Sequence, residues 1–460
     1  MSQNAGLNRR AFLRNAGMTA LVGAVGPGSV GTVAASAAFA GPDGKFDFDT
    51  PYNRFGTDSS KYDRPTRIYG KDSIQVGMGI ADMDFRVAPA ITKALMERMQ
   101  HENWGYLDMP RSFADTIVGW NKRRYGVDIN PDSLVITTGV HPGLIAALKT
   151  FSPPGSKVLL NTPVYDGFYS DLTYTGTTPE ENPLKLVDGR YSIDFEDFER
   201  RISHNTNTFI LCNPQNPTGN FWSPEDLTRL GEICLRRRVI VLADEIHCDW
   251  TTKGSKYTPF ASLPNKAIVD NSLTFKAASK SFGLAAMKCA WFYSTNPDLV
   301  ARVKANNRAD LTTMGMIASR AAYTGGEDWL NQCVEYIDGN HDFVQSFVRA
   351  NMPMVKVAKS QGTYLSWLDV TQVAEKIGAK ELAVEANRKQ PNLPKPLTPE
   401  QMVERWFVAN AKVHMNPGSS YGTGGANHMR MNIATSRKTL ELALTNIANA
   451  LKKPNPTTAL

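Results

Sequence analysis

The sequence predicts an α/β protein with a large domain, built on a mostly parallel sheet covered by helices, and a smaller α+β domain. At 460 residues the chain is longer than one hydrophobic core usually supports, so we expect two unequal domains. From about Ser133, apolar strands alternate with amphipathic helices over roughly 160 residues, which is typical of βαβ units. The continuous apolar run Val239–Ala243 is typical of a strand buried on both faces of a parallel sheet.

The large domain is expected to span residues 91–344. A helix at Pro89–Gln100 leads into it, with its proline near the start, where the missing N–H costs least. The strands expected in the sheet are Leu134–Thr137, Lys157–Leu160, Thr208–Cys212, Val239–Ala243, Leu273–Phe275 and Ala290–Tyr293. The helices expected between them are His141–Lys149, Asp166–Leu172 and Ser223–Arg236. After about Asp310 the pattern is helical through Ala350.

The smaller domain is expected to combine two distant parts of the chain, residues 41–90 and 345–451. The first part begins as an arm with little regular structure, up to about Lys71, and continues with a short strand in Ile74–Phe85. The second part is expected to contain strands at Thr363–Asp369, Lys412–Met415 and His428–Ile433, and helices at Pro399–Asn410 and from Arg437. We interpret Arg388–Pro396 as an exposed loop insertion and residues 452–460 as a disordered tail.

The N-terminal stretch, residues 1–40, predicts an export signal. Asn8–Arg14 is a twin-arginine pattern, a weakly apolar Gly-rich run follows, and Ala38-Phe-Ala40 has the A-x-A form of a cleavage site. A membrane-spanning helix is disfavoured because Pro27 and nearby glycines weaken a helix and dilute its hydrophobicity. Such signals are similar to those of proteins that the twin-arginine machinery exports already folded. We expect cleavage after about Ala40, a periplasmic mature protein and no stable membrane insertion.

Composition and charge narrow the class of protein. The chain is 42% hydrophobic and 21% charged, which is typical of a globular protein with an ample core. The formal charge of +7 falls to about +4 when Arg9, Arg10 and Arg14 leave with the signal, and no Lys/Arg-rich run follows. Nucleic-acid binding therefore has little support. The five cysteines include no C-x-x-C pair, so we expect small buried residues and no disulfide framework.

Residues that can carry chemistry follow several of the expected strands, at the edge where open α/β sheets bind ligands. Thr138–Gly143 is a Gly-bearing turn at a helix start, whose free N–H groups suit a phosphate. Tyr165 and Asn216 follow the next two strands. Asp244 ends the strand Val239–Ala243, where a buried carboxylate is costly unless it meets a cation. Lys280 follows the next strand among small residues, where burial lowers its proton affinity and makes it a usable nucleophile.

Each of these features alone has a plainer explanation, such as a turn that closes a βα unit, a core tyrosine, a loop asparagine or a solvated lysine. Together they supply a phosphate cradle, an aromatic ring, an amide, a carboxylate for a protonated ring nitrogen and a lysine for an aldehyde. Pyridoxal 5′-phosphate needs this set of groups. The sequence therefore predicts a pyridoxal-phosphate site, and it predicts no metal site.

Two further motifs carry a family resemblance, Asp244-Glu-Ile-His-Cys-Asp249 and Ala81-Asp-Met-Asp-Phe85. From about Ile74 to Arg437 the chain resembles the fold-type-I pyridoxal-phosphate enzymes of the aminotransferase class I/II superfamily. The two motifs resemble its cystathionine β-lyase (MalY/PatB) branch. The resemblance implies that Lys280 forms the Schiff base with the cofactor and moves the Cα proton of the substrate. It also implies that Asp244 pairs with the ring nitrogen.

The same resemblance assigns the remaining site residues. Asn216 and His247 address the ring hydroxyl, Tyr165 stacks on the ring, and the phosphate is held by the backbone of Gly139, Val140 and His141. Lys288 takes the place of an arginine that binds the phosphate in many aminotransferases. Tyr106, in Trp104-Gly-Tyr106, resembles a tyrosine that reaches the phosphate of the neighbouring subunit, which implies a homodimer. Arg430, in Met429–Ala434, resembles the arginine that grips the α-carboxylate of the substrate in a bidentate way.

The sequence leaves two reactions open, which share the removal of the Cα proton by Lys280 and differ in the step after it. The two motifs above favour the lyase branch. Three features favour an aminotransferase: the sequence motif Asn-Pro-Thr-Gly219, the sequence Lys280–Ala285 and the positive charge of Lys288. We predict an exported aminotransferase that acts on an amino acid or on an amino-acid-bearing substrate, such as a siderophore or peptide-like precursor. A carbon–sulfur β-lyase is the alternative, and a non-catalytic binding protein is disfavoured by the complete set of site residues.

Overall fold

The computed structural model describes residues 44–187 and 189–453. The predicted export signal, residues 1–40, lies outside the described residues, as do residues 454–460 of the predicted tail. Within the described ranges, no helix has the length and apolar character needed to cross a membrane. All five cysteines are buried and free, which confirms the expectation of small buried residues.

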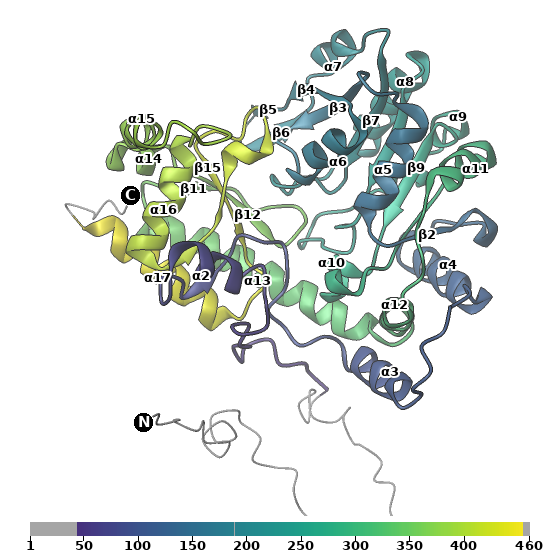
Figure 1. The fold of residues 1–460 in the computed structure, drawn as a ribbon, viewed down its shortest axis with the longest axis horizontal. Coiled ribbons are helices and arrows are strands. Elements are labelled where there is room, and N and C mark those ends of the chain that lie inside the picture. Colours follow the sequence, from purple (N-terminus) through teal and green to yellow (C-terminus); the bar gives the residue numbers. More distant parts are fainter. Residues whose placement is uncertain (1–43, 188, 454–460) are drawn as a thin grey trace, which may run out of the picture.

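A seven-stranded sheet forms the centre of the large domain, in the order β2-β10-β9-β8-β7-β3-β4 (Figure 1). The strands are β2 (Val135–Thr137), β3 (Lys157–Thr162), β4 (Thr178–Pro183), β7 (Thr206–Cys212), β8 (Ile240–Asp244), β9 (Ser272–Lys276) and β10 (Ala290–Tyr293). The pairs from β4 through to β9 are parallel, and β10 runs antiparallel to both of its neighbours. The predicted, mostly parallel sheet is therefore confirmed. The prediction omitted β4 because its sequence, Thr-Pro-Glu-Glu-Asn-Pro, has no apolar run.

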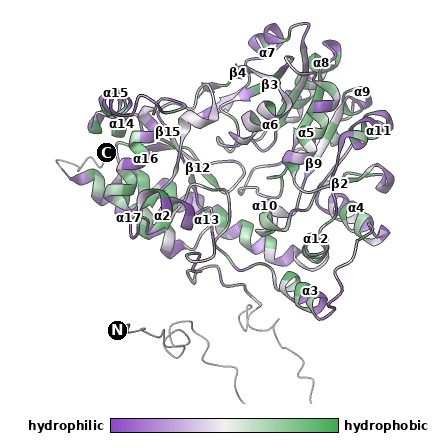
Figure 2. Cartoon of the chain, in the orientation of Figure 1, coloured by the Kyte–Doolittle hydropathy of each residue, from purple (hydrophilic) through white to green (hydrophobic). Residues whose placement is uncertain are grey.

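Helices cover both faces of this sheet. Leu242 of β8 packs in one hydrophobic cluster with α5 (Val140–Phe151), whereas its neighbours Val241 and Ala243 pack in another with α8 (Pro224–Arg236). This alternation follows from the two-residue period of a strand, and it explains why β8 is apolar from Ile240 to Ala243. The other helices of the covering layers are α6 (Gly167–Thr175), α7 (Phe195–Arg201), α9 (Lys266–Val269) and α11 (Pro297–Asn306). Hydrophobic and hydrophilic residues alternate along these helices in Figure 2, as expected for helices with one buried face.

Further helices lie beyond the covered sheet. They are α3 (Pro89–Met99), α4 (Arg111–Tyr125), α10 (Ser279–Phe282), α12 (Thr313–Gly325) and α13 (Glu327–Asn351). Trp120 of α4 packs against Tyr323 of α12, with ring centroids 4.9 Å apart. The long helix α13 runs from this region toward the C-terminal sheet (Figure 1).

The C-terminal part forms a four-stranded sheet in the order β11-β12-β15-β14, with helices packed around it. Its strands are β11 (Lys356–Val357), β12 (Leu365–Asp369), β14 (Asn416–Pro417) and β15 (His428–Asn432). Its helices are α14 (Thr371–Ile377), α15 (Ala379–Lys389), α16 (Pro399–Ala411) and α17 (Arg437–Lys452). The predicted loop insertion is partly wrong, because Arg388 and Lys389 belong to α15. A hairpin of β5 (Lys185–Val187) and β6 (Arg190–Ser192) reaches this part from the large domain.

The N-terminal arm packs against the C-terminal part. Strand β1 (Val76–Gly77) pairs in parallel with β13 (Val413–His414). The arm also contains a helix, α2 (Asp63–Tyr69), which lies beside the yellow C-terminal helices in Figure 1. The hydroxyl of Tyr69 donates a hydrogen bond of 2.8 Å to Glu404 of α16. The prediction of an arm with little regular structure omitted α2, whose two turns are too short to show a clear helical period.

Candidate active site

A cavity of about 420 Å³ lies at the carboxyl ends of several strands of the large sheet. Its lining brings together most of the predicted site residues: Gly139, Val140, His141, Tyr165, Asn216, Asp244, His247, Lys280 and Lys288. The backbone between β1 and α3 closes the cavity on one side through Ala81. Residues from five separate segments of sequence therefore share one cavity, as the strand-end argument predicts.

The first wall is the start of helix α5, which follows β2. The helix begins at Val140, and the described residues include no side chain that caps its first turn. The first N–H groups of a helix have no partner within the helix, and the helix dipole adds partial positive charge there. This end of α5, with Gly139 to His141 in the cavity lining, can therefore hold an anionic group such as a phosphate.

His141 and Tyr165 form a connected pair on this side of the cavity. Nδ1 of His141 lies 2.7 Å from Asp171, and Nε2 lies 3.2 Å from the hydroxyl of Tyr165. Burial alone lowers the pKa of His141, but the hydrogen bond and charge of Asp171 outweigh it and raise that pKa. Asp171 orients the imidazole, which in turn fixes the Tyr165 ring at the cavity. Sequence reasoning missed Asp171, and its signal was the one charged residue of helix α6.

Asp244 ends β8 inside the protein, where it is 5% exposed. Its carboxylate accepts a hydrogen bond of 3.1 Å from the N–H of Ile246. Burial raises the pKa of Asp244 to about 6, and the Ile246 N–H partly opposes this rise. Among the residues that the structure describes, no lysine, arginine or histidine forms an ion pair with Asp244. A carboxylate held in this way favours a bound group that brings its own proton or positive charge.

Asn216 and Arg430 meet across the cavity from different sheets. Arg430 of β15 is 2% exposed and donates hydrogen bonds to Oδ1 of Asn216, at 3.1 Å, and to the carbonyl of Gly79, at 2.8 Å. Its Nε is buried and has no hydrogen-bond partner within the described chain. Arg430 is outside the set of lining residues, but its contact with Asn216 places its guanidinium directly behind the cavity wall.

His247 lies deeper, in the turn after β8. Burial lowers its pKa well below the ordinary value, so the ring is neutral. Its ring packs edge-on against Tyr364, with centroids 5.5 Å apart. Nδ1 of His247 is buried and finds no partner among the described residues. The ring therefore has a hydrogen-bonding position left over for a bound molecule.

Lys280 lies in the short helix α10, and its Nζ donates a hydrogen bond of 2.8 Å to the carbonyl of Ala81. The hydroxyl of Tyr364 donates to the same carbonyl at 3.1 Å. Burial lowers the pKa of Lys280 to about 8, although the charge of Asp82 opposes the fall. The indole N–H of Trp250 holds the carbonyl of Lys280 at 3.0 Å. Lys280 is therefore a positioned amine that is partly neutral near neutral pH, as a nucleophile and base requires.

Asp249 supports α10 from behind. Its carboxylate accepts short hydrogen bonds from the hydroxyls of Ser281 and Tyr125, and Arg124 lies 3.2 Å away. Asp249 is 3% exposed, so this is an internal ion pair. Sequence reasoning gave Asp249 no role, although it ends the motif that begins at Asp244.

Lys288 and Tyr106 lie at the periphery. Lys288 borders the cavity but is exposed, and its backbone has a left-handed φ of 56°. Tyr106 is fully exposed, between α3 and α4, and does not line the cavity of its own chain. A residue that serves the neighbouring subunit would have this exposure in a single chain. That role of Tyr106 stays a prediction.

These residues fit pyridoxal 5′-phosphate. The free N–H groups of α5 match its phosphate, the buried carboxylate of Asp244 matches a protonated ring nitrogen, and Lys280 matches its aldehyde. The unpartnered Nδ1 of His247 offers a hydrogen bond to the same molecule. In the described part of the chain, no three His, Cys, Asp or Glu side chains are arranged to hold a metal ion.

Comparisons with known proteins agree with this chemistry. The family model "Aminotransferase class I and II" matches residues 73–447. The cystathionine β-lyase PatB of Bacillus subtilis is 36% identical over 411 residues, which cover 88% of this chain and 99% of PatB. Cystalysin of Treponema denticola, solved with pyridoxal 5′-phosphate, has a TM-score of 0.79 at 28% identity, covering 89% of this chain and 99% of cystalysin. A pyridoxal-phosphate-bound candidate aminotransferase of Clostridium difficile 630 has a TM-score of 0.80 at 31% identity, covering 89% and 100%.

Proposed function

The chain belongs to the aminotransferase class I and II family and depends on pyridoxal 5′-phosphate, and from that premise we propose that it is a carbon–sulfur β-lyase. Its substrate class is an L-amino acid with a thioether or thiol on Cβ, of the cystathionine or cysteine-conjugate type. The observation that carries the proposal is the 36% identity to a cystathionine β-lyase across almost the whole of that relative. This evidence favours the lyase over the aminotransferase that the spellings around Gly219 and Lys280 predicted.

The cofactor would be held by the residues that line the cavity. Lys280 would bind its aldehyde, Asp244 its ring nitrogen, and Asn216 and His247 its ring hydroxyl. Tyr165 would lie against the ring, and the N–H groups at the start of α5 would hold the phosphate, with Lys288 adding charge. When bound, the cofactor supplies an electron sink for the bonding pair that Cα retains after it loses its proton.

The chain's own residues then perform positioning and proton transfer. Arg430 binds the α-carboxylate of the substrate, for which its buried, partly unpartnered guanidinium is suited. Lys280, with a pKa lowered by burial to about 8, takes the Cα proton as a general base. The Cβ–S bond breaks and the sulfur leaves as a thiol after gaining a proton. Addition of water to the remaining fragment gives pyruvate and ammonia, so the reaction needs no keto acid.

A substrate assay tests the proposal. The purified protein, loaded with pyridoxal 5′-phosphate, is given L-cystathionine without any keto acid, and pyruvate and free thiol are measured. We expect both products at equal rates, and no product from Lys280→Ala. The proposal fails if pyruvate stays at the Lys280→Ala level while amino transfer to an added keto acid proceeds.

An aminotransferase remains the second candidate, because a solved structure of similar TM-score is named as one. The same site serves both reactions up to the removal of the Cα proton. The two candidates differ in their need for an acceptor: without a keto acid, a transaminase would stop after one half-reaction, with at most one product molecule per active site. Product formed per mole of enzyme, without a keto acid, therefore separates them.

We also propose export by the twin-arginine machinery to the periplasm, on the basis of Asn8–Arg14 and Ala38–Ala40. These residues lie outside the described part of the chain. Replacing both Arg9 and Arg10 by lysine should retain the protein in the cytoplasm of a host with this export system. Export of that double variant at the wild-type level would contradict the proposal.

A further inference from the structure

Ala81 lines the cavity and belongs to the backbone segment Gly79–Asp84, which has no regular secondary structure. Five consecutive carbonyls of this segment each accept a hydrogen bond from a side chain. The donors are Arg430 to Gly79, Asn432 to Ile80, Lys280 and Tyr364 to Ala81, Lys61 and Asn432 to Asp82, and Arg54 to Met83. The segment is therefore shaped by side chains in place of a strand ladder.

These donors come from three parts of the molecule. Asn432 ends β15 and Tyr364 directly precedes β12, so both belong to the C-terminal part. Arg430 and Lys280 belong to the active site, and a bound substrate and cofactor would draw both of them away from the segment. Arg54 and Lys61 belong to the N-terminal arm, and neither lines the cavity. The arm donors can hold the segment while the active-site donors change partners.

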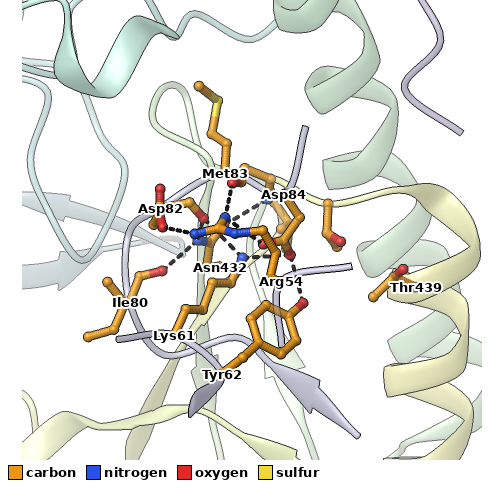
Figure 3. Close-up of polar contacts among 12 residues, drawn as sticks. Arg54, Lys61, Tyr62, Ile80, Asp82, Met83, Asp84, Asn432 and Thr439 are labelled. Carbon is orange, nitrogen blue, oxygen red and sulfur yellow. Dashed lines mark hydrogen bonds and ion pairs between the residues drawn. The ribbon is translucent and has the colours of Figure 1, made fainter. Parts of the chain in front are cut away.

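Arg54 makes the most extensive contact with the segment (Figure 3). Its guanidinium lies 2.6 Å from the carboxylate of Asp82 and 3.3 Å from that of Asp84, and it donates to the carbonyl of Met83. Lys61, which is fully buried, holds the other oxygen of Asp84 at 2.8 Å, and Tyr62 donates to the same oxygen. Arg54 and Asp82 are the partly exposed members, at 18% and 27% of their side chains. Their pair therefore forms the solvent-facing end of the cluster, and Asp82 directly follows Ala81 in the sequence.

Charges from several elements act on Lys280. Asp82 and Asp244 favour its protonated form, whereas Arg430 and Lys288 oppose it. His141 and His247 face Lys280 from α5 and from the turn after β8. Asp82 has the largest effect of these charges on Lys280. Its carboxylate forms an ion pair with Arg54 of the N-terminal arm.

We propose that Arg54 is a positioning residue for Lys280: it anchors Asp82, Met83 and Asp84, which directly follow Ala81, and it balances the Asp82 carboxylate, whose charge acts on the lysine amine. Loss of the guanidinium removes a cation and frees the carboxylate, and both changes favour the protonated amine. Loss of the Asp82 charge has the opposite sign, because the cluster then holds two cations, Arg54 and Lys61, and only one carboxylate, Asp84. The inference rests on the proposed role of Lys280 but not on the choice between lyase and aminotransferase.

The test measures the proton on the Lys280 nitrogen directly. The first readout is the pH midpoint of the visible absorbance of the holoenzyme, in which the cofactor is bonded to Lys280. The second is the pH midpoint for acetylation of Lys280 in the cofactor-free full chain, followed by mass spectrometry of its peptide. Neither readout depends on turnover, so a protein that fails the lyase assay still tests this inference.

In Arg54→Ala we expect both midpoints to rise by about one pH unit. In Asp82→Asn, which keeps nearly the same shape, we expect them to fall, and in the double variant to return toward wild type. Arg54→Lys keeps the cation, so both pH midpoints should stay close to those of the wild-type protein. Arg67→Ala is the matched control, since it removes an exposed arginine from the same arm.

Three outcomes would overturn the inference. One is an Arg54→Ala midpoint that equals that of Arg67→Ala. Another is a shift of Arg54→Ala and Asp82→Asn in the same direction, which indicates general loosening of the segment. If Arg54→Ala does not fold, Asp82→Asn and Arg54→Lys decide: a midpoint unchanged in Asp82→Asn contradicts the proposal.

Discussion

The two walls of the cavity are built in different ways. On the strand-end wall, Asp244 and the start of α5 are fixed by the backbone of the sheet and its helices. On the arm-side wall, Gly79–Asp84 is fixed by side chains that lie up to 352 positions away in sequence. A wall made of regular structure is already in place before any ligand binds. A wall made of side-chain donors can change when two of those donors, Lys280 and Arg430, acquire other partners.

This difference divides the work of the site. The strand-end wall presents groups that a cofactor needs permanently, namely N–H donors for a phosphate and a carboxylate for a ring nitrogen. The arm-side wall presents the Ala81 carbonyl to Lys280, a contact that exists only while the amine is free. Substitutions on the strand-end wall should therefore change cofactor binding and chemistry. Substitutions on the arm-side wall should change stability and the proton equilibrium of Lys280.

The largest effect is expected from Lys280→Ala, which removes the group shared by both walls. Loss of the base and of the covalent cofactor link should lower the rate of pyruvate formation by about 10³-fold or more. The visible absorbance of the lysine-bound cofactor should disappear at the same time. Lys149→Ala, which removes an exposed lysine from the last turn of α5, outside the cavity lining, is the control and should keep that absorbance. Unchanged absorbance in Lys280→Ala would show that another lysine binds the cofactor.

The arm-side wall should respond most strongly to Asp84→Asn. The change leaves Lys61 fully buried without a carboxylate partner, which should lower the free energy of unfolding by about 3 kcal/mol. The measurement is the urea midpoint, compared with that of Asp115→Asn, which breaks an exposed pair with Arg111 and should have almost no effect. Adding Lys61→Met to Asp84→Asn should recover part of the loss, because no buried charge is then unpaired. If the double variant is as unstable as Asp84→Asn alone, the unpaired charge of Lys61 is not the cause of the lost stability.

Asp244 gives an effect of similar size, which depends on pH and on the cofactor. Because burial raises its pKa to about 6 in the folded protein, the cofactor-free protein loses stability as pH rises from about 4 to about 6. The loss is complete above that range and amounts to about 3 kcal/mol. In Asp244→Asn this loss should be absent, so the cofactor-free variant should be the more stable protein at pH 7. Urea unfolding at pH 4 and pH 7 measures the difference.

Cofactor binding should reverse the order for Asp244. The wild-type carboxylate gains a charged partner in the ring nitrogen, whereas the amide of Asp244→Asn cannot keep that nitrogen protonated. The variant should therefore bind the cofactor more weakly, which a fluorescence titration measures. Equal stability of the two cofactor-free proteins at both pH values would contradict a raised pKa for Asp244.

The two walls also differ in how far the sequence predicts them. Asp244, Lys280 and Asn216 could be placed at one edge because each follows an apolar run, and parallel strands bring their ends together. The arm-side contacts could not be placed, since no periodic pattern connects Arg54 to Met83 or Asn432 to Ile80. The motif Ala81–Phe85 identified the segment but not its partners. Strand β4 and helix α2 escaped prediction for a related reason: one lacks apolar residues, and the other has only two turns.

The smallest effect is expected at a position that belongs to neither wall of this chain. Tyr106 is fully exposed, and we propose that in a homodimer its hydroxyl reaches the phosphate in the cavity of the neighbouring subunit. Tyr106→Phe removes one hydrogen bond to an anion, so the dissociation constant of the cofactor should rise about tenfold. The urea midpoint of the cofactor-free protein should not change, because the fully exposed hydroxyl forms no hydrogen bond with the described residues of its own chain. Sedimentation provides the second measurement. A wild-type protein that sediments as a monomer with its cofactor bound would rule out the shared site.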